Sequence, residues 1–159
     1  MLKFKTFLCL FFIIISCKPT SEQKGARINN KSDFITITKD TLIKYNIEGI
    51  STEGAGADVN YVNGIINKSI INIYAGTWQA IIVYEFEENK IKVLETKYSY
   101  NVEIEDVKSD KDMHKDYEIS YFIDFKGNVL GKEFPERIDV FKEFKDIVPF
   151  ELQTDKMKK

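Results

Sequence analysis

The acidic stretch around His114 contains the residue types that bind metal ions or transfer protons. Its carboxylates are Asp106, Asp110, Asp112, Asp116 and Glu118. Clustered carboxylate oxygens suit Ca²⁺, but an EF-hand loop starting at Asp110 requires glycine in place of Lys115 and glutamate in place of Tyr121. We therefore interpret the stretch as a solvated charged loop, and we expect no metal site and no cofactor.

His114 is the only histidine of the chain, which restricts the catalytic chemistry that the sequence supports. One histidine cannot form a metal site that requires several histidines, and we expect no Ser-His-Asp triad. Acidic residues occur on several predicted strands, and no motif singles out a carboxylate pair for acid–base catalysis. Residues 53–56 lack the lysine and the following helix of a phosphate-binding loop. We expect no catalytic residue and no enzyme activity.

The aromatic residues are the remaining candidates for a binding site. Those on or beside predicted strands are Tyr74, Trp78, Tyr84, Tyr98, Tyr100, Tyr117 and Tyr121. Gathered on one exposed face, they would suit a protein, a glycan or an apolar ligand, since Tyr and Trp are enriched at binding hot spots. The alternative, which we favour, is core packing and cross-strand pairing. Trp78, Tyr74 and Tyr84 are the candidate binding residues, with Trp78 foremost because it follows a glycine turn.

A short apolar segment ends at Cys17, the second of the two cysteines. Lys3 and Lys5 precede this segment, and residues 7–15 are almost entirely apolar. As a helix, such a segment would span about 14 Å, well short of the ~30 Å hydrocarbon core of a membrane. The pattern therefore predicts a removable secretory signal over residues 1–16 rather than a membrane-spanning helix.

The junction Ile14-Ile15-Ser16-Cys17 resembles the lipobox of bacterial lipoproteins, although leucine is commoner in place of Ile14 and alanine or glycine in place of Ser16. The resemblance implies lipidation of Cys17 and a lasting membrane anchor, because each buried methylene contributes about 0.8 kcal/mol. Lys18 stands where an aspartate would imply retention at the inner membrane, so we expect the outer membrane and a periplasm-facing domain. The alternative is an ordinary secretory signal in which Cys17 is incidental.

Charge, length and cysteine content indicate the domain organisation. With 23 basic and 25 acidic side chains, the chain gives no sign of the basic face that nucleic-acid binding requires. Once Cys17 is lipidated, no thiol remains for a disulfide, a metal or catalysis. We predict a flexible tether over residues 17–32, a single globular β-rich domain over residues 33–152 and a disordered tail over residues 153–159.

Alternating apolar residues predict a sheet of consecutive strands. The expected strands cover residues 34–38, 47–52, 59–62, 65–74, 79–86, 91–100, 117–125 and 129–134. Thr38 is a suitable cap for a short helix over residues 39–46. Asn63-Gly64 predicts a two-residue hairpin turn. A charged interval over residues 103–116 separates the two parts of the sheet.

The C-terminal region predicts a helix that packs on the sheet. Pro135 suits the first turn of a helix over residues 136–146. The apolar stripe of this helix consists of Ile138, Phe141, Phe144 and Ile147 or Val148. We predict an α+β fold that is mostly β, with an antiparallel meander sheet of about six to eight strands and a C-terminal helix packed on one face.

Several turn and core positions carry a second resemblance. They are Glu53-Gly54, Tyr61-Val62-Asn63-Gly64, Ile73-Tyr74-Ala75-Gly76, Tyr84-Glu85-Phe86 and Tyr98-Ser99-Tyr100-Asn101. In this order they resemble a group of small uncharacterised bacterial lipoproteins with a β-meander. The chain departs from that group at Ala75, which separates Tyr from Gly, and at Trp78, where a glycine is usual. The resemblance implies a fold and a cellular location, and it implies no activity.

These patterns together predict a lipid-anchored, non-enzymatic protein of the cell envelope that acts by binding a protein, as an inhibitor or immunity factor does. The expected partners are the membrane, through the N-terminal lipid, and an envelope protein, whereas nucleic acid is not expected. Two alternatives remain open. One is a carrier or receptor for a lipid or other apolar ligand held between sheet and helix, and the other is a structural subunit of an outer-membrane assembly.

Overall fold

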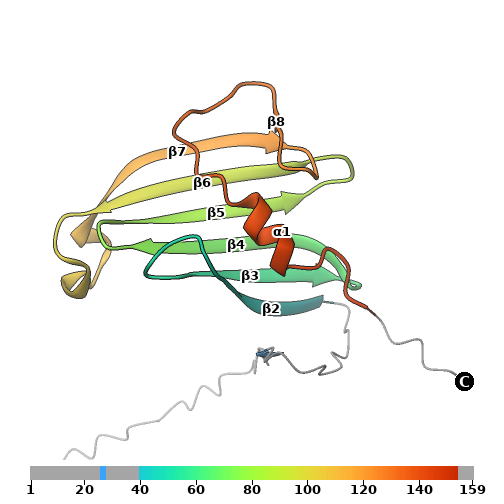
Figure 1. Cartoon of the computed structure of the whole chain (residues 1–159), viewed down its shortest axis with the longest axis horizontal. Coiled ribbons are helices and arrows are strands. Elements are labelled where there is room, and N and C mark those ends of the chain that lie inside the picture. The colour runs from blue at the N-terminus through green and yellow to red at the C-terminus, as the bar shows by residue number, and fades with distance from the viewer. Residues whose placement is uncertain (1–25, 28–39, 154–159) are drawn as a thin grey trace, which may run out of the picture.

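The computed structural model describes residues 26–27 and 40–153, which form one sheet with a short helix against it (Figure 1). The predicted signal segment over residues 1–16, Cys17 and most of the predicted tether lie outside the described residues. The strand predicted over residues 34–38 and nearly all of the tail predicted over residues 153–159 also lie outside them. These features therefore stay predictions.

The eight strands lie side by side in the order in which they occur in the chain. They are β1 (Ala26–Arg27), β2 (Asp40–Ile47), β3 (Ala55–Val62), β4 (Ile65–Ala75), β5 (Trp78–Phe86), β6 (Ile91–Tyr100), β7 (Met113–Ile123) and β8 (Val129–Leu130). Only the pairing of β1 with β2 is parallel; the other six described pairings are antiparallel. Two 3₁₀ turns, η1 (Ile104–Asp106) and η2 (Asp110–Asp112), precede β7, and the helix α1 (Phe141–Ile147) follows β8. The predicted meander with a C-terminal helix is confirmed.

The hairpin between β3 and β4 forms at the predicted Asn63-Gly64 turn. Both residues have positive φ, 53° for Asn63 and 82° for Gly64, as the type I′ turn requires. This turn pairs Val62 with Ile65 and so starts the register of the two strands. Because side chains alternate between the two faces of a strand, this register decides which residues of β3 and β4 meet on each face.

The helix predicted over residues 39–46 and the strand predicted over residues 47–52 are wrong. Residues 40–47 form β2 and pair with β3 along their whole length, which buries Ile43 and Ile47. Alternation with period two and pairing with β3 therefore override the local capping signal of Thr38. The chain turns after β2, and Ser51 stabilises this turn because its hydroxyl donates to the Tyr74 carbonyl oxygen at 2.6 Å.

The C-terminal helix starts later than predicted. The Arg137 N–H donates to the Phe134 carbonyl oxygen at 3.1 Å, which closes a turn after Pro135. The Ile138 N–H donates to a side chain of the sheet instead of a helical carbonyl. The helix therefore begins only at Phe141, and the strand predicted over residues 129–134 is shortened to β8.

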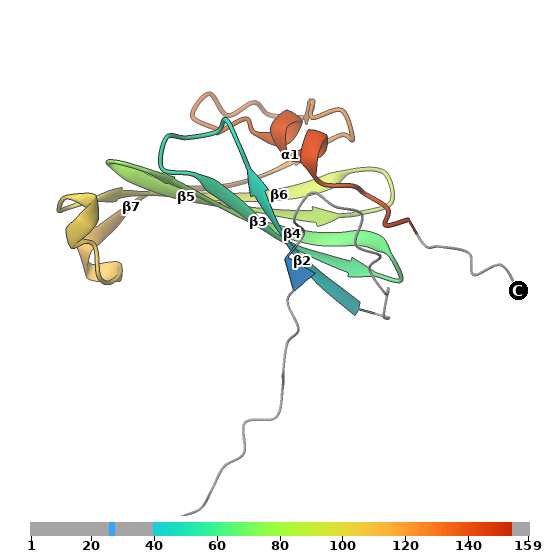
Figure 2. The same cartoon turned by 60° about the horizontal axis from the view of Figure 1, so that its bottom comes forward.

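Helix α1 covers one face of the sheet, which we call the covered face; the opposite side is the open face. Figure 2 shows α1 and the chain that leads into it on the same side of the sheet. Phe141 and Phe144 of α1 are buried, and their rings meet the Tyr84 ring with centroid distances of 5.6 and 5.2 Å. Edge-to-face contacts of this kind stabilise a core beyond the area that they bury.

Candidate functional site

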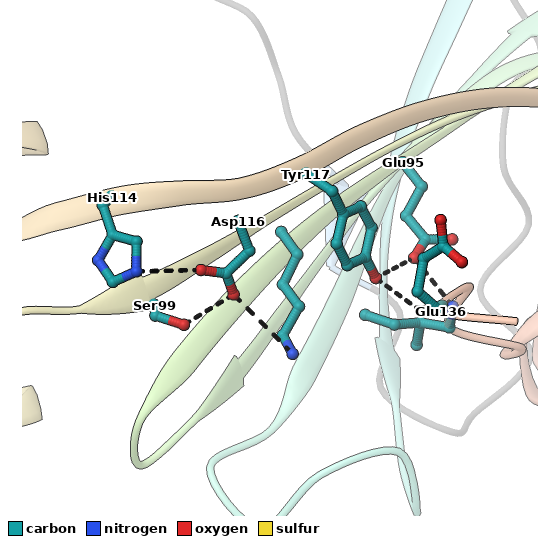
Figure 3. A network of polar contacts seen from close by, with 8 residues as sticks. Glu95, Ser99, His114, Asp116, Tyr117 and Glu136 are labelled. Atoms are coloured by element: carbon teal, nitrogen blue, oxygen red, sulfur yellow. Dashed lines mark hydrogen bonds and ion pairs between the residues drawn. The ribbon is translucent and has the colours of Figure 1, made fainter. Parts of the chain in front are cut away.

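Glu95 is a fully buried carboxylate in the middle of β6, on the covered face (Figure 3). Its Oε1 accepts hydrogen bonds from the Tyr117 hydroxyl at 2.7 Å and from the Ile138 N–H at 2.9 Å. Its Oε2 accepts from the Tyr121 hydroxyl at 3.0 Å. Burial raises the pKa of Glu95, and the three hydrogen bonds oppose this rise.

The partners of Glu95 join two parts of the fold. Tyr117 and Tyr121 belong to β7, whereas Ile138 belongs to residues 131–140, which we call the C-terminal strap. The Tyr117 hydroxyl also lies 2.9 Å from the Glu136 carbonyl oxygen of the strap. Because protein donors occupy the carboxylate and its exposure is 0%, this arrangement suits the attachment of the strap better than proton exchange with a substrate.

Asp116 forms a second polar cluster on the same face, closer to the end of the sheet (Figure 3). The register shifts between Lys97 and Tyr98, so Asp116 has no partner residue in β6. Its carboxylate accepts from the Ser99 hydroxyl at 2.7 Å and lies 3.2 Å from His114 Nε2. A bulge of this type aims two successive side chains at one face.

The order of groups in this cluster differs from that of a nucleophilic triad. A triad places histidine between serine and carboxylate, so that the imidazole can take the proton of the serine. Here Asp116 lies between Ser99 and His114, and His114 Nδ1 faces Asn101 Oδ1 at 2.9 Å. His114 lies within β7 rather than in a loop, and its side chain is largely exposed. The cluster therefore provides no histidine base for Ser99.

The acidic stretch before β7 uses one of its carboxylates to order its own backbone. Asp112 accepts from the N–H groups of Lys108 and Ser109 at 3.0 and 2.9 Å, and these bonds lower its pKa. Within residues 26–27 and 40–153, no three side chains of the metal-binding types gather closely enough to hold an ion.

The three candidate binding residues do not form one surface. Tyr84 is 2% exposed and lies in the core beneath α1. Trp78 is half-buried on the covered face, with the Lys97 amine 5.2 Å from its ring centre. Tyr74 lies on the open face and is 44% exposed. The register between β4 and β5 therefore places Tyr74 on the opposite face of the sheet from Trp78 and Tyr84.

A different group of tyrosines meets on the open face. Pairing across the strands aligns Tyr74 with Gln79 and Gln79 with Tyr98, which places the three side chains in one row. The Tyr100 hydroxyl reaches the Gln79 side-chain oxygen at 3.5 Å, so it shares this end of the face. The tyrosines are therefore gathered at one end of the open face.

Aliphatic side chains form the centre of the open face. Ile70, Val83 and Leu94 are direct cross-strand partners on β4, β5 and β6, and Ile81 lies in the neighbouring row. Ile70 is 38% exposed and Leu94 is 39% exposed. We call these four residues the aliphatic patch. Its members point away from the core and lie next to one another, so they form a continuous apolar surface.

Ion pairs border the aliphatic patch. Lys68 and Lys92 both donate to the Glu85 carboxylate at 3.1 Å, and they lower its pKa. The other pairs of this face are Lys44 with Asp58 and Lys115 with Glu118. These contacts involve four lysines and three carboxylates.

Two depressions interrupt the surface elsewhere. One, of about 350 Å³, is mainly apolar and is lined by Ile65, Ile66, Phe86, Phe125 and Phe150, with two glutamates at its border. The other, of about 300 Å³, lies between the turn after β7 and the strap, and it is lined by Arg137, Asp139 and Lys142 among others. Its charges are of both signs, because the Arg137 guanidinium pairs with Asp139 at 2.8 Å.

Glu95 was not among the residues predicted from the sequence, although the pattern of β6 contains a signal for it. Ile91, Val93 and Glu95 alternate along the strand, so the glutamate occupies a position that points into the core. An acidic residue in such a position requires hydrogen-bond donors. The donors themselves could not be identified, because Ile138 is 43 residues away in the chain.

The chain was also compared with protein-family models, curated proteins and solved structures, and no match was found. The resemblance to lipoproteins therefore stays a prediction. No helix within residues 26–27 and 40–153 has the length and apolar character needed to cross a membrane.

Proposed function

We propose that this protein is a lipid-anchored, non-enzymatic component of the cell envelope that binds another protein through the open face of its sheet. The supporting observation is the aliphatic patch, where Ile70 and Leu94 are exposed at the centre of the face opposite α1. Contiguous exposed apolar surface bordered by polar groups is typical of protein interaction sites. An inhibitor or immunity factor would use such a face.

The chemistry of the open face indicates the partner surface. The aliphatic patch requires an aliphatic surface opposite it, because burying apolar area supplies most of the association energy. Lys68 and Lys92 share one carboxylate, Glu85, so an acidic side chain of the partner would complement the second lysine. Tyr74 and Tyr98 provide amphipathic rings at the end of the contact.

The proposed location is the periplasmic side of the outer membrane. It relies on the signal predicted over residues 1–16, on lipidation of Cys17 and on Lys18 as the following residue. Membrane fractionation of cells that produce the wild type or Cys17→Ala tests the anchor. The wild type should sediment with membranes and Cys17→Ala should be released. If both forms fractionate alike, lipidation of Cys17 is wrong.

Site-specific photo-cross-linking in cells tests the binding face. A photoreactive side chain at Leu94 reports on the aliphatic patch, and the same group at Ile147, 38% exposed on helix α1 of the covered face, is the matched control. We expect one discrete protein adduct from Leu94 and none of that size from Ile147. The same adduct from both positions, or no adduct from Leu94, contradicts binding through the open face.

A second candidate function is the carriage of an apolar ligand, which the depression beside Phe150 favours. The space between sheet and helix is filled by rings such as those of Tyr84 and Phe144, so this depression is the better place for a ligand. Native mass spectrometry of the protein extracted from envelopes should then detect a bound lipid, and Phe150→Trp should reduce its occupancy. A protein that never carries additional mass contradicts this candidate.

A further inference from the structure

The C-terminal strap has no backbone partner in the sheet along most of its length. Residues 131–140 contain no helix or strand, and six of the ten are exposed. Phe134, Ile138 and Val140 provide the main apolar contacts of the strap. Segments with irregular backbone and few buried contacts are the first to open locally. The strap is therefore a candidate for motion relative to the sheet.

Polar contacts between the strap and the sheet converge on one position. The Ile138 N–H donates to Glu95, and the Tyr117 hydroxyl lies within reach of both Glu95 and the Glu136 carbonyl oxygen. Phe134 adds an apolar contact, with its ring 5.8 Å from that of Tyr121. These contacts hold the strap against the sheet, and the closed strap covers Glu95.

Tyr117 allows the closed arrangement to exist with Glu95 ionised or protonated. One hydroxyl proton can be donated to the carboxylate at 2.7 Å or to the Glu136 carbonyl oxygen at 2.9 Å. When Glu95 is ionised, it needs the Tyr117 proton as a hydrogen bond. When Glu95 is protonated, it can donate to the Tyr117 oxygen while Tyr117 donates to Glu136. Both states then satisfy their buried polar atoms, as a closed strap requires.

Charged and titratable groups from every neighbouring element face Glu95. They are Tyr84 on β5, Lys97 on β6, Tyr117 and Tyr121 on β7, and Glu136, Arg137 and Asp139 on the strap. Burial raises the pKa values of Tyr84, Tyr117 and Tyr121 further above their ordinary values, so these hydroxyls stay protonated near neutral pH. Arg137 favours the ionised form of Glu95, but burial has the larger effect.

We propose that the strap is a pH-responsive latch, closed over Glu95 in acid and released more often as the pH rises. Opening would admit water to Glu95 and uncover the half-buried Ile119, which pairs with Glu95 across the sheet. The inference does not depend on the proposed protein partner, because it concerns the covered face.

The direction follows from the two environments of the carboxylate. In the closed state burial raises the pKa of Glu95, whereas in the open state water returns this pKa toward its ordinary value. The closed state therefore binds a proton more tightly than the open state, and deprotonation favours opening. One linked proton changes the opening equilibrium by at most about tenfold per pH unit, and only between the two pKa values.

Hydrogen exchange of the full-length protein in detergent tests the latch. The readout is the protection factor of the Ile138 amide between pH 4.5 and 8. A protection factor is used because it corrects for the pH dependence of the chemical exchange step. The Ile82 amide on the central strand β5 reports global unfolding, and Glu118→Gln is a control for loss of an exposed carboxylate on β7.

We expect Ile138 to exchange faster than Ile82 at every pH, with protection that falls by up to about tenfold per pH unit and then levels off. Glu95→Gln should give a flat profile, and Glu118→Gln should behave as the wild type does. Tyr117→Phe removes a contact with the strap and should speed the exchange of Ile138 at every pH. Equal exchange of Ile138 and Ile82, or a flat wild-type profile, overturns the proposal.

Discussion

The Glu95 carboxylate accepts a hydrogen bond from the Ile138 N–H at 2.9 Å, although 43 residues separate the two in the chain. This contact has two consequences for the fold. It satisfies a carboxylate that is wholly removed from water, and it diverts the Ile138 N–H from the helix that Pro135 would otherwise begin. The contact between Glu95 and Ile138 therefore both attaches the strap to the sheet and delays the start of α1.

Removal of the Glu95 carboxylate should destabilise the protein strongly. Glu95→Leu leaves the Ile138 N–H and the Tyr121 hydroxyl without their acceptor, whereas Tyr117 can still donate to the Glu136 carbonyl oxygen, and each buried unsatisfied donor costs about 1 to 3 kcal/mol. We expect the free energy of unfolding to fall by about 3 kcal/mol in urea at neutral pH. Glu118→Leu is the control, because Glu118 is exposed and should change stability by less than about 1 kcal/mol. Equal losses in the two variants contradict the role of Glu95.

The stability that Glu95 contributes should decrease as the pH rises. Its folded-state pKa is raised, so the native state binds more protons than the unfolded state between the two pKa values. The contribution is fully present below the ordinary pKa of a glutamate and is lost as the pH passes the raised one. In urea unfolding, the wild type should therefore lose stability relative to Glu95→Gln between pH 4 and pH 8. If the wild type gains stability relative to Glu95→Gln over this range, the raised pKa of Glu95 is wrong.

Ser69 should be replaceable without loss of stability. Within the part of the chain that the structure describes, its Oγ is buried and has no hydrogen-bond partner. Its cross-strand neighbours, Val59 and Tyr84, are also buried. Because an unpaired buried hydroxyl costs about 1 to 3 kcal/mol, Ser69→Ala should leave the thermal midpoint unchanged or raise it. A clear decrease in the midpoint would show that Ser69 has a partner, such as a buried water.

Gly127 and Gly76 offer a matched pair of glycine substitutions. Gly127, in the turn after β7, has φ of +94°, and a Cβ there would lie 2.9 Å from Phe141 Cδ1. Gly127→Ala should therefore destabilise the protein by about 1 to 3 kcal/mol and disturb the packing of α1. Gly76 has open space around it and no positive φ, so Gly76→Ala should change the thermal midpoint little. Similar effects at both glycines contradict the close approach at Gly127.

Local features of the fold could be predicted from the sequence, because short-range physics determines them. The Asn63-Gly64 turn requires two residues that tolerate positive φ, and Phe141 and Phe144 carry the helical spacing of a buried stripe. A helix was predicted over residues 39–46 because Thr38 resembles a cap. Residues 40–47 instead pair with β3, and this long-range contact makes them a strand.

The candidate site could be predicted less well, because it depends on register and on distant contacts. Alternation within β5 shows which residues share a side with Tyr84, but the turn at Gly76 decides on which side of the sheet Tyr74 lies. The predicted set of binding residues, Trp78, Tyr74 and Tyr84, therefore contains side chains from opposite faces of the sheet. The aliphatic patch likewise exists only because Ile70, Val83 and Leu94 align across three strands.

The most direct test of binding through the open face uses the photoreactive group at Leu94 together with Ile70→Glu. Ile70 lies in the same row of the aliphatic patch and is exposed, so a glutamate there should leave the thermal midpoint nearly unchanged while it places a charge in the contact. Ile147→Glu, on helix α1 of the covered face, is the matched control, because Ile147 is exposed to the same extent as Ile70. We expect Ile70→Glu to abolish the Leu94 adduct and Ile147→Glu to preserve it. An adduct that survives Ile70→Glu in a folded protein contradicts the central claim that the aliphatic patch binds the partner.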